Sequence, residues 1–122
     1  MAKHYNLGIK GEEIATQYLL GKGYKIIERN WRHGKDEIDI IALDGNFLVI
    51  VEVKTRSTNF FGEPEEAVTD TKQKFLVRAA EEYVIKKDIH LEIRFDIISI
   101  IIEQAKETIR HIKSAFYPEL YE

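Results

Sequence analysis

Two acidic residues and one lysine in the middle of the chain have the types and the spacing that metal-assisted hydrolysis requires. Asp39, Glu52 and Lys54 lie within two strongly apolar stretches, where a carboxylate without a partner is costly to bury. Two carboxylates on one rigid surface suit a hard divalent cation such as Mg²⁺, which keeps waters for a substrate phosphate. A lysine beside them can position an attacking water or stabilise charge on the phosphate. The pattern predicts a site for phosphodiester hydrolysis, and its structural alternative is a salt bridge on a β-hairpin.

The elements that position these residues follow from hydrophobic periodicity and turn signals. One helix is predicted over residues 7–22, with Asn6 as its N-cap. A second helical region is predicted to open at Pro64 and to end at Lys86-Lys87. The predicted strands cover residues 24–31, 37–43, 46–54 and 91–98. The C-terminal stretch, residues 103–122, fits either an edge strand or a short helix, and the sequence leaves both open.

The turn between the two central strands decides which side chains share a face of the sheet. An Asp-Gly turn at residues 44–45 pairs Asp39 with Ile50. Because side chains alternate along a strand, Glu52 and Lys54 then fall on the same face as Asp39. The apolar residues predicted on the other face are Ile38, Ile40, Val49, Val51 and Val53.

The Asp-x12-Glu-x-Lys spacing resembles the core motif of the PD-(D/E)xK nuclease superfamily, with Ile38 where the motif has proline. Further motifs resemble those of the YraN-type family of small bacterial predicted endonucleases, across roughly residues 6–116. Those motifs are Gly11-Glu12, Asn30-Trp31-Arg32, Glu37-Ile38-Asp39, Val51-Glu52-Val53-Lys54-Thr55-Arg56, Arg94-Phe95-Asp96 and His111-Ile112. The family is similar in pattern to archaeal Holliday-junction resolvases. This chain departs from it at Asp36, where the family often has glycine.

The resemblance implies both a fold and an activity. The fold is α/β, a restriction-endonuclease-like core with a central mixed sheet flanked by helices. The activity is that of a metal-dependent DNA endonuclease, with branched or otherwise structured DNA among its candidate substrates. Asp39, Glu52 and the carbonyl of Val53 would hold Mg²⁺ or Mn²⁺, while Lys54 would position the nucleophilic water.

Five further residues are assigned roles around this centre. Glu12 matches a glutamate early in the first helix of the resolvase-like pattern, which assists at the metal. Helical spacing places Glu12 at the edge of the apolar face of the first predicted helix. Its alternative is an ordinary acid in the first turn, favoured by the helix dipole. The residues predicted to contact nucleic acid are Arg32, Arg56, Lys72 and Gln73. For Lys72 the alternative is a boundary lysine whose ammonium reaches out to water.

The composition limits the remaining classes of function. A chain of 122 residues with 44% hydrophobic residues predicts one globular domain, residues 1–122. It contains no cysteine, which excludes a thiolate zinc site and a cysteine nucleophile. With a net charge of −3, DNA binding needs a local basic patch or metal ions that cover the acids. Without a signal-peptide core or a membrane-spanning apolar run, we expect a cytoplasmic protein with no membrane partner.

Two other functions stay open at the level of sequence. A catalytically silent nucleic-acid-binding module would keep the fold and need no divalent ion. A small oligomeric scaffold would need neither metal nor DNA, and the apolar tail at residues 116–121 is its support. If the protein makes paired cuts on two DNA strands, a symmetric homodimer is the simplest assembly.

Overall fold

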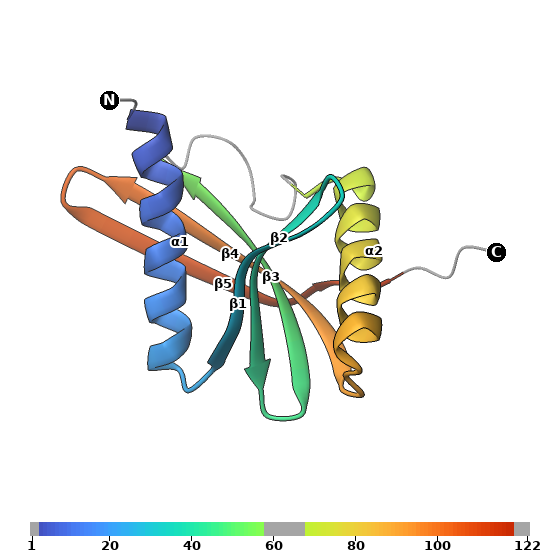
Figure 1. The fold of residues 1–122 in the computed structure, drawn as a ribbon. Coiled ribbons are helices and arrows are strands. Elements are labelled where there is room, and N and C mark those ends of the chain that lie inside the picture. Colours follow the sequence, from blue (N-terminus) through green and yellow to red (C-terminus); the bar gives the residue numbers. More distant parts are fainter. Residues whose placement is uncertain (1–2, 58–67, 119–122) are drawn as a thin grey trace.

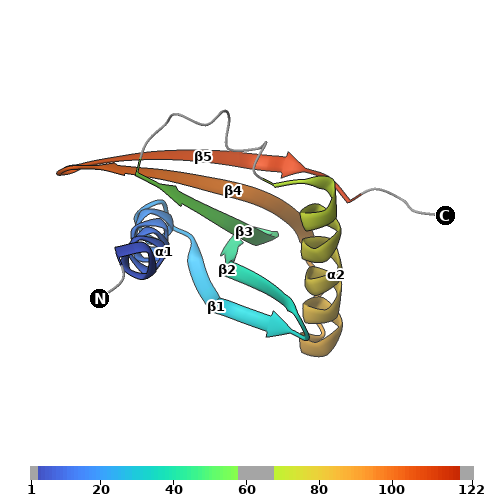
Figure 2. The ribbon, with the colours of Figure 1, turned by 90° about the horizontal axis from the view of Figure 1, so that it is seen from above.

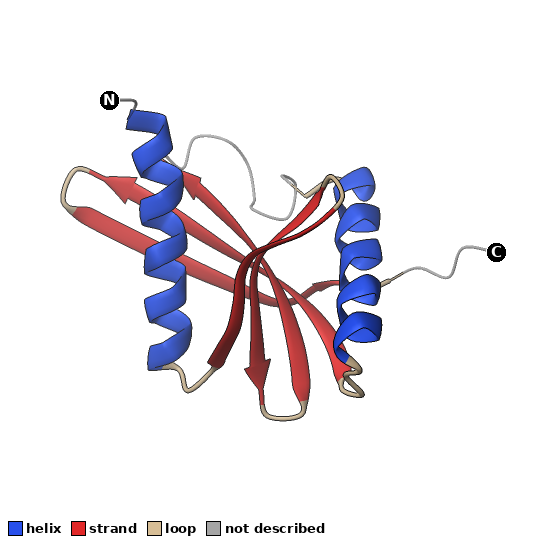
Figure 3. Ribbon diagram, in the orientation of Figure 1, coloured by secondary structure: helices blue, strands red, loops and turns tan. Residues whose placement is uncertain are grey.

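The structure, a computed structural model, describes residues 3–57 and 68–118 and contains one five-stranded sheet with two helices (Figure 1, Figure 3). The elements in chain order are α1 (Lys3–Gly21), β1 (Lys25–His33), β2 (Asp36–Asp44), β3 (Phe47–Arg56), α2 (Asp70–Lys87), β4 (Glu92–Glu103) and β5 (Lys106–Phe116). The strands lie in the order β1-β2-β3-β4-β5, with β3 and β4 parallel and all other neighbours antiparallel. This arrangement confirms the predicted α/β class and the central mixed sheet flanked by helices. Within the described ranges, no helix is long and apolar enough to cross a membrane.

The two helices cover opposite faces of the sheet. Val49 and Val51 of β3 belong to a buried cluster with Leu19 of α1, whereas Leu48 and Ile50 belong to the cluster beneath α2. This is the alternation that a strand buried on both faces must show. Figure 2 shows the twisted sheet running between α1 and α2. Glu52 and Lys54 continue the α2-facing series of β3, so they point toward the start of α2.

The helix boundaries correct two predictions. Helix α1 begins at Lys3, before Asn6, so Asn6 lies inside the helix and is not its N-cap. Helix α2 begins after Thr69, whose side chain accepts a hydrogen bond from the backbone N–H of Lys72. Its last turn carries Lys86 and Lys87, as the sequence predicted. Pro64, the predicted opening of this helix, lies outside the described residues.

The hairpin between β2 and β3 turns one residue later than predicted. Asp44 pairs with Phe47, so the two turn residues are Gly45 and Asn46, and Gly45 has the positive φ of 59° that glycine accepts readily. The predicted pairing of Asp39 with Ile50 is therefore wrong, because Ile41 pairs with Ile50. The register moves by two positions, which keeps the parity. The observed pairs end at Ile40–Val51, so this register does not extend to Asp39.

One residue of β2 lies on the face opposite to the predicted one. Ile38 packs in the same buried cluster as Ile41, beneath α2, although strict alternation would place it with Ile40. The cause is that β2 pairs with β3 only as far as Ile40–Val51, while its earlier residues pair with β1 alone. The alternation breaks at Asp39, where β2 leaves the plane of the central strands.

Strand β5 is an edge strand, so the edge-strand alternative is correct for residues 106–116 of the stretch left open, residues 103–122. Strand β5 pairs with β4, and the register is interrupted between Phe95 and Ile97. Asp96 lies at this irregularity. Tyr117 and Pro118 are exposed, and the remaining tail, residues 119–122, lies outside the described residues.

We predict that Gly11→Ala destabilises the protein, because α1 touches β3 at this position. A Cβ on Gly11 would collide with the hydroxyl of Thr55 and would lie 2.8 Å from its Cβ and Cγ2. Overpacking of this kind costs about 1–3 kcal/mol in the free energy of unfolding. Gly8→Ala on the same helix meets no atom within 4 Å and is the matched control. It should be neutral or stabilising by up to about 1 kcal/mol. Denaturant unfolding that finds both variants equally stable would contradict the close contact.

Candidate functional site

The central feature of the candidate site is the contact between Asp39 and the backbone of Val53. The N–H of Val53 donates a hydrogen bond of 2.8 Å to Oδ2 of Asp39. In a continuous sheet this N–H would face the neighbouring strand, but β2 and β3 cease to pair after Ile40–Val51. Because the N–H and C=O of one strand residue point to the same edge, the Val53 carbonyl also lies on the edge that faces Asp39. The structure thus brings Asp39 to the backbone of Val53, two of the three groups predicted to hold a metal.

The environment of Asp39 favours its neutral form in the absence of a cation. Burial raises the pKa of Asp39, and the neighbouring charge of Glu52 raises it further, to about 7. The hydrogen bond from Val53 acts in the opposite direction without cancelling these effects. A carboxyl group held near neutrality by burial and by a second carboxylate is typical of a functional site.

Glu52 is the most deeply buried acid of this group, with 4% of its surface exposed. Its Oε2 lies 3.5 Å from Nζ of Lys54 and 3.4 Å from Nζ of Lys72. Its other oxygen, Oε1, is buried and has no hydrogen-bond partner within the described part of the chain. A buried carboxylate oxygen without a donor is unfavourable, so this atom has the capacity to bind a further positive group.

Glu12 of α1 lies within electrostatic reach of Asp39 and Glu52. Burial raises the pKa of Glu12, partly offset by a hydrogen bond with the Asn30 side chain and by the charge of Arg29. The carboxylates of Glu37 and Glu52 also raise it, so Glu12 lies within their electrostatic reach. The close packing of Gly11 against Thr55 explains this position, since it holds α1 directly against β3.

The donor set fits Mg²⁺ or Mn²⁺ better than an ion that needs many side-chain ligands. Over residues 3–57 and 68–118, no three His, Asp or Glu side chains form a cluster that could hold a metal ion. Mg²⁺ is usually bound through one or two carboxylates and keeps several waters. Asp39, the free oxygen of Glu52 and the Val53 carbonyl meet that requirement.

Of the four residues predicted to contact nucleic acid, Lys72 is brought into the site through its contact with Glu52. The side-chain amide of Gln73 donates to the carbonyl of Val68 and so supports the start of α2. Arg32 lies at the end of β1 and pairs with Glu37 across the strands, at 3.5 Å. Arg56 lies two residues beyond Lys54 on β3 and is half-buried.

A second polar cluster, around Asp96 of β4, was not assigned a role from the sequence. The buried carboxylate of Asp96 accepts hydrogen bonds from Arg94, from the backbone N–H of Ser114 and from Nε2 of His111. Arg94 also donates to Asp44 and to the hydroxyl of Tyr24. The signal in the sequence is Arg94-Phe95-Asp96 itself, two charges in an apolar strand. Because the donors match the acceptors, we interpret this cluster as structural.

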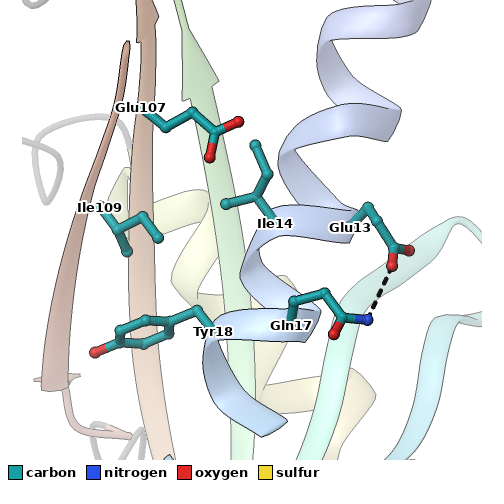
Figure 4. Close-up of a pocket in the computed structure, with 6 residues that line it drawn as sticks. All are labelled: Glu13, Ile14, Gln17, Tyr18, Glu107 and Ile109. Atoms are coloured by element: carbon teal, nitrogen blue, oxygen red, sulfur yellow. Dashed lines mark hydrogen bonds between the residues drawn. The ribbon is translucent and has the colours of Figure 1, made fainter. Parts of the chain in front are cut away.

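A shallow pocket between α1 and β5 does not belong to the candidate site. Its volume is about 380 Å³. Its lining residues are Glu13, Ile14, Gln17, Tyr18, Glu107 and Ile109 (Figure 4). Two carboxylates and an apolar wall are unsuited to a polyanion such as DNA. Glu13, the neighbour of Glu12, is exposed, and its carboxylate pairs with Arg29 of β1 at 3.1 Å.

We predict that Asp39→Asn stabilises the protein in EDTA above pH 7. The pKa of Asp39 is about 7 in the fold against 3.8 as its ordinary value. Ionisation of Asp39 therefore lowers stability progressively as pH rises from about 4 to about 7, and the full loss remains above that. At about 1.4 kcal/mol per unit of pKa, even half of the shift makes the substitution stabilising by about 2 kcal/mol at pH 8. Urea unfolding between pH 4 and pH 8 measures it, and a variant less stable than wild type at pH 8 would contradict it.

We predict that Asp96→Asn strongly destabilises the protein. Burial alone would raise the pKa of Asp96, but hydrogen bonds from His111, Arg94 and Ser114 hold it below the ordinary value. A lowered pKa contributes stability above about pH 4, which is lost as pH falls through the folded-state pKa. Breaking such a buried pair costs about 3–5 kcal/mol. Denaturant unfolding at pH 7 checks this, with the exposed Glu103→Gln as the control that should change stability by less than about 0.5 kcal/mol.

Comparison with known proteins agrees with the motifs. Residues 11–100 match the family described as "Uncharacterised protein family UPF0102". A UPF0102 protein of Bacteroides thetaiotaomicron is 52% identical over 99% of this chain and 100% of its own. One of Flavobacterium psychrophilum is 51% identical over 96% of this chain and 98% of its own. Among solved structures, SfsA of Pyrococcus furiosus in complex with Ca²⁺ is 17% identical with a TM-score of 0.34, covering 90% of this chain and 63% of that one. The sequence identities extend over almost the whole chain, and the protein therefore belongs to the UPF0102 family, the YraN-type family that its motifs resemble.

Proposed function

We propose that this protein is a metal-dependent endonuclease that hydrolyses phosphodiester bonds in DNA. The observation that carries the proposal is the buried Glu52, whose Oε1 has no partner within the described residues, beside an Asp39 whose pKa is raised to about 7. Two acids placed at such a cost to stability need a compensating ligand, and a divalent cation supplies it.

Each residue has a distinct part in this proposal. Asp39, Glu52 and the Val53 carbonyl would hold Mg²⁺ or Mn²⁺, which supplies charge neutralisation at the phosphate and a water of lowered pKa. Lys54 projects from the same strand, with its ammonium 3.5 Å from Glu52, and orients the attacking water. Glu12, whose own pKa is raised by burial, accepts a proton or hydrogen-bonds a water at the edge of the site.

The surroundings support a nucleic-acid substrate. Lys72 approaches the same carboxylate from the start of α2, where its ammonium can turn to a phosphate once a cation occupies Glu52. Arg56 and Arg32 extend the positive charge along β3 and at the end of β1. We include in the proposal a cytoplasmic setting, DNA as the partner, and a symmetric homodimer if the two strands are cut as a pair.

A second candidate function is a catalytically silent nucleic-acid-binding module. The observation that favours it is that Lys54 and Lys72 both contact Oε2 of Glu52, which neutralises this acid without any metal. Such a module would bind DNA equally well in EDTA, with an affinity that falls steeply with salt.

The test is cleavage of labelled linear, nicked, flapped and four-way-junction DNA in Mg²⁺, in Mn²⁺ and in EDTA. We expect cutting only with a divalent ion, and we expect Glu52→Gln to fall below about 1% of the wild-type rate. Glu12→Gln should be impaired, while Glu13→Gln, its exposed neighbour on the same helix, should keep wild-type activity.

Measurements of metal binding and of DNA binding distinguish the nuclease from the silent binding module. If the acids hold a cation, Mg²⁺ raises the melting temperature of the wild type and leaves that of Asp39→Asn unchanged. Metal-independent DNA binding without cutting of any substrate would reject the nuclease in favour of the silent module.

A further inference from the structure

An exposed aromatic ring lies one helical turn from the candidate site. Phe75 of α2 is 41% exposed, and the guanidinium carbon of Arg78 lies 5.0 Å from the centre of its ring. Leu76 and Ala79, in the same turns, are buried beneath the helix, so Phe75 and Arg78 belong to a flank of α2 and not to the core. An aromatic ring that is partly exposed and lies against a cation offers a flat surface on which a second ring can stack.

Arg78 is held in one orientation by Asp36. Its Nε donates to Oδ2 of Asp36 at 2.8 Å, and its Nη2 donates to Oδ1 at 3.0 Å. Asp36 is buried, whereas the Arg78 side chain is 59% exposed. A bidentate pair fixes the plane of the guanidinium, which then offers an exposed flat surface at a small further loss of entropy. Asp36 is also the position at which this chain departs from the glycine of the family pattern.

The Phe75–Arg78 pair is adjacent to the groups that would act on a phosphate. Lys72 precedes Phe75 by three residues, and side chains at that spacing on a helix lie about 5–6 Å apart. The ammonium of Lys72 is 3.4 Å from Glu52. Its charge also contributes to lowering the pKa of Asp36, whose main cause is the hydrogen bond from Arg78. A phosphate at Lys72 therefore brings the next part of its nucleotide within reach of Phe75.

We propose that Phe75 and Arg78 stack an unpaired nucleobase beside the phosphate at the Asp39–Glu52 site, so that the substrate carries single-stranded nucleotides there. An aromatic ring under a fixed cation binds a flat, electron-rich ring, and the lysine beside it binds the attached phosphate. In an unbroken duplex the bases are stacked on each other and are not free for Phe75. The position of the scissile bond rests on the proposed function, whereas the stacking contact does not.

The experiment measures DNA affinity in the full chain carrying Glu52→Gln, so that binding is read without cutting. The probe is a single strand of about 12 nucleotides that contains the fluorescent base 2-aminopurine, compared with a fully paired duplex. Phe75→Ala should weaken single-strand binding about 5- to 150-fold and abolish the quenching of 2-aminopurine that stacking causes. Duplex binding should change less than about twofold, because phosphate contacts are unaltered.

Two further variants test whether the effect of Phe75→Ala is due to loss of the aromatic ring. Ile85→Ala truncates another exposed apolar residue of the same helix, 73% exposed, and should change neither affinity. Phe75→Trp keeps a flat ring and should retain single-strand binding and quenching. Circular dichroism and thermal melting confirm that each variant is folded.

The outcomes distinguish this proposal from the nuclease proposal. Equal loss of single-strand and duplex binding in Phe75→Ala, or no loss of either, overturns the stacking contact even if the wild type cuts DNA. Selective loss of single-strand binding supports the contact even if no metal produces cleavage. In that case Phe75 and Arg78 belong to a single-strand-binding module and not to a nuclease.

Discussion

The candidate site depends on the separation of β2 from β3 after the Ile40–Val51 pair. In a continuous antiparallel ladder, the N–H and C=O of Val53 would be used by the neighbouring strand. Because β2 departs, the Asp39 carboxylate takes the N–H of Val53, and the carbonyl beside it is directed at the same space. The same departure explains why Ile38 packs beneath α2. The separation thus leaves the backbone of Val53 facing the Asp39 carboxylate instead of a neighbouring strand.

Two buried acids show how a structural cluster differs from a candidate site in this fold. Asp96 has donors for both of its oxygens, and its pKa is held below the ordinary value in spite of burial. Glu52 is as inaccessible, yet one oxygen has no donor among the described residues and the other has lysines at 3.4 and 3.5 Å. The first arrangement is complete without any ligand. The arrangement at Glu52 leaves a buried oxygen unpaired, and the rest of the fold must compensate for its cost in stability. An uncompensated polar group of this kind is typical of a binding site without its ligand.

The sequence predicted those features that depend on local periodicity or on parity. Glu52 and Lys54 share a face because side chains alternate along β3, even though the predicted turn was wrong, whereas no observed β2–β3 pair extends to Asp39. The choice of Glu12 followed from the family resemblance together with helical spacing. What the sequence could not predict depends on contacts between distant elements. Ile38 lies on the unexpected face because β2 separates from β3. The residue pattern of 37–43 contains no signal for that separation.

The Asp36–Arg78 pair is of the same kind. Its partners are 42 positions apart, so it follows from the way the β1–β2 turn meets the flank of α2. The predicted start of α1 is wrong for a related reason. Residues 3–6 contain no strong helix breaker, so α1 begins before Asn6, the predicted N-cap. Local signals rank the candidates for a helix start, and the packing of the whole helix on the sheet decides among them.

The net charge of −3 does not argue against a polyanionic substrate once burial is considered. Around the site, Asp36 and Glu52 are buried, and Asp39 is neutral over much of the range below its pKa of about 7. The basic groups that face them, Lys72 and Arg78, keep 40% and 59% of their side chains exposed. Buried acids therefore orient the cations, while the cations make up the surface that an approaching phosphate meets. The formal net charge counts the buried acids and the exposed basic groups equally. The electrostatic potential outside the protein, however, is dominated by the exposed groups.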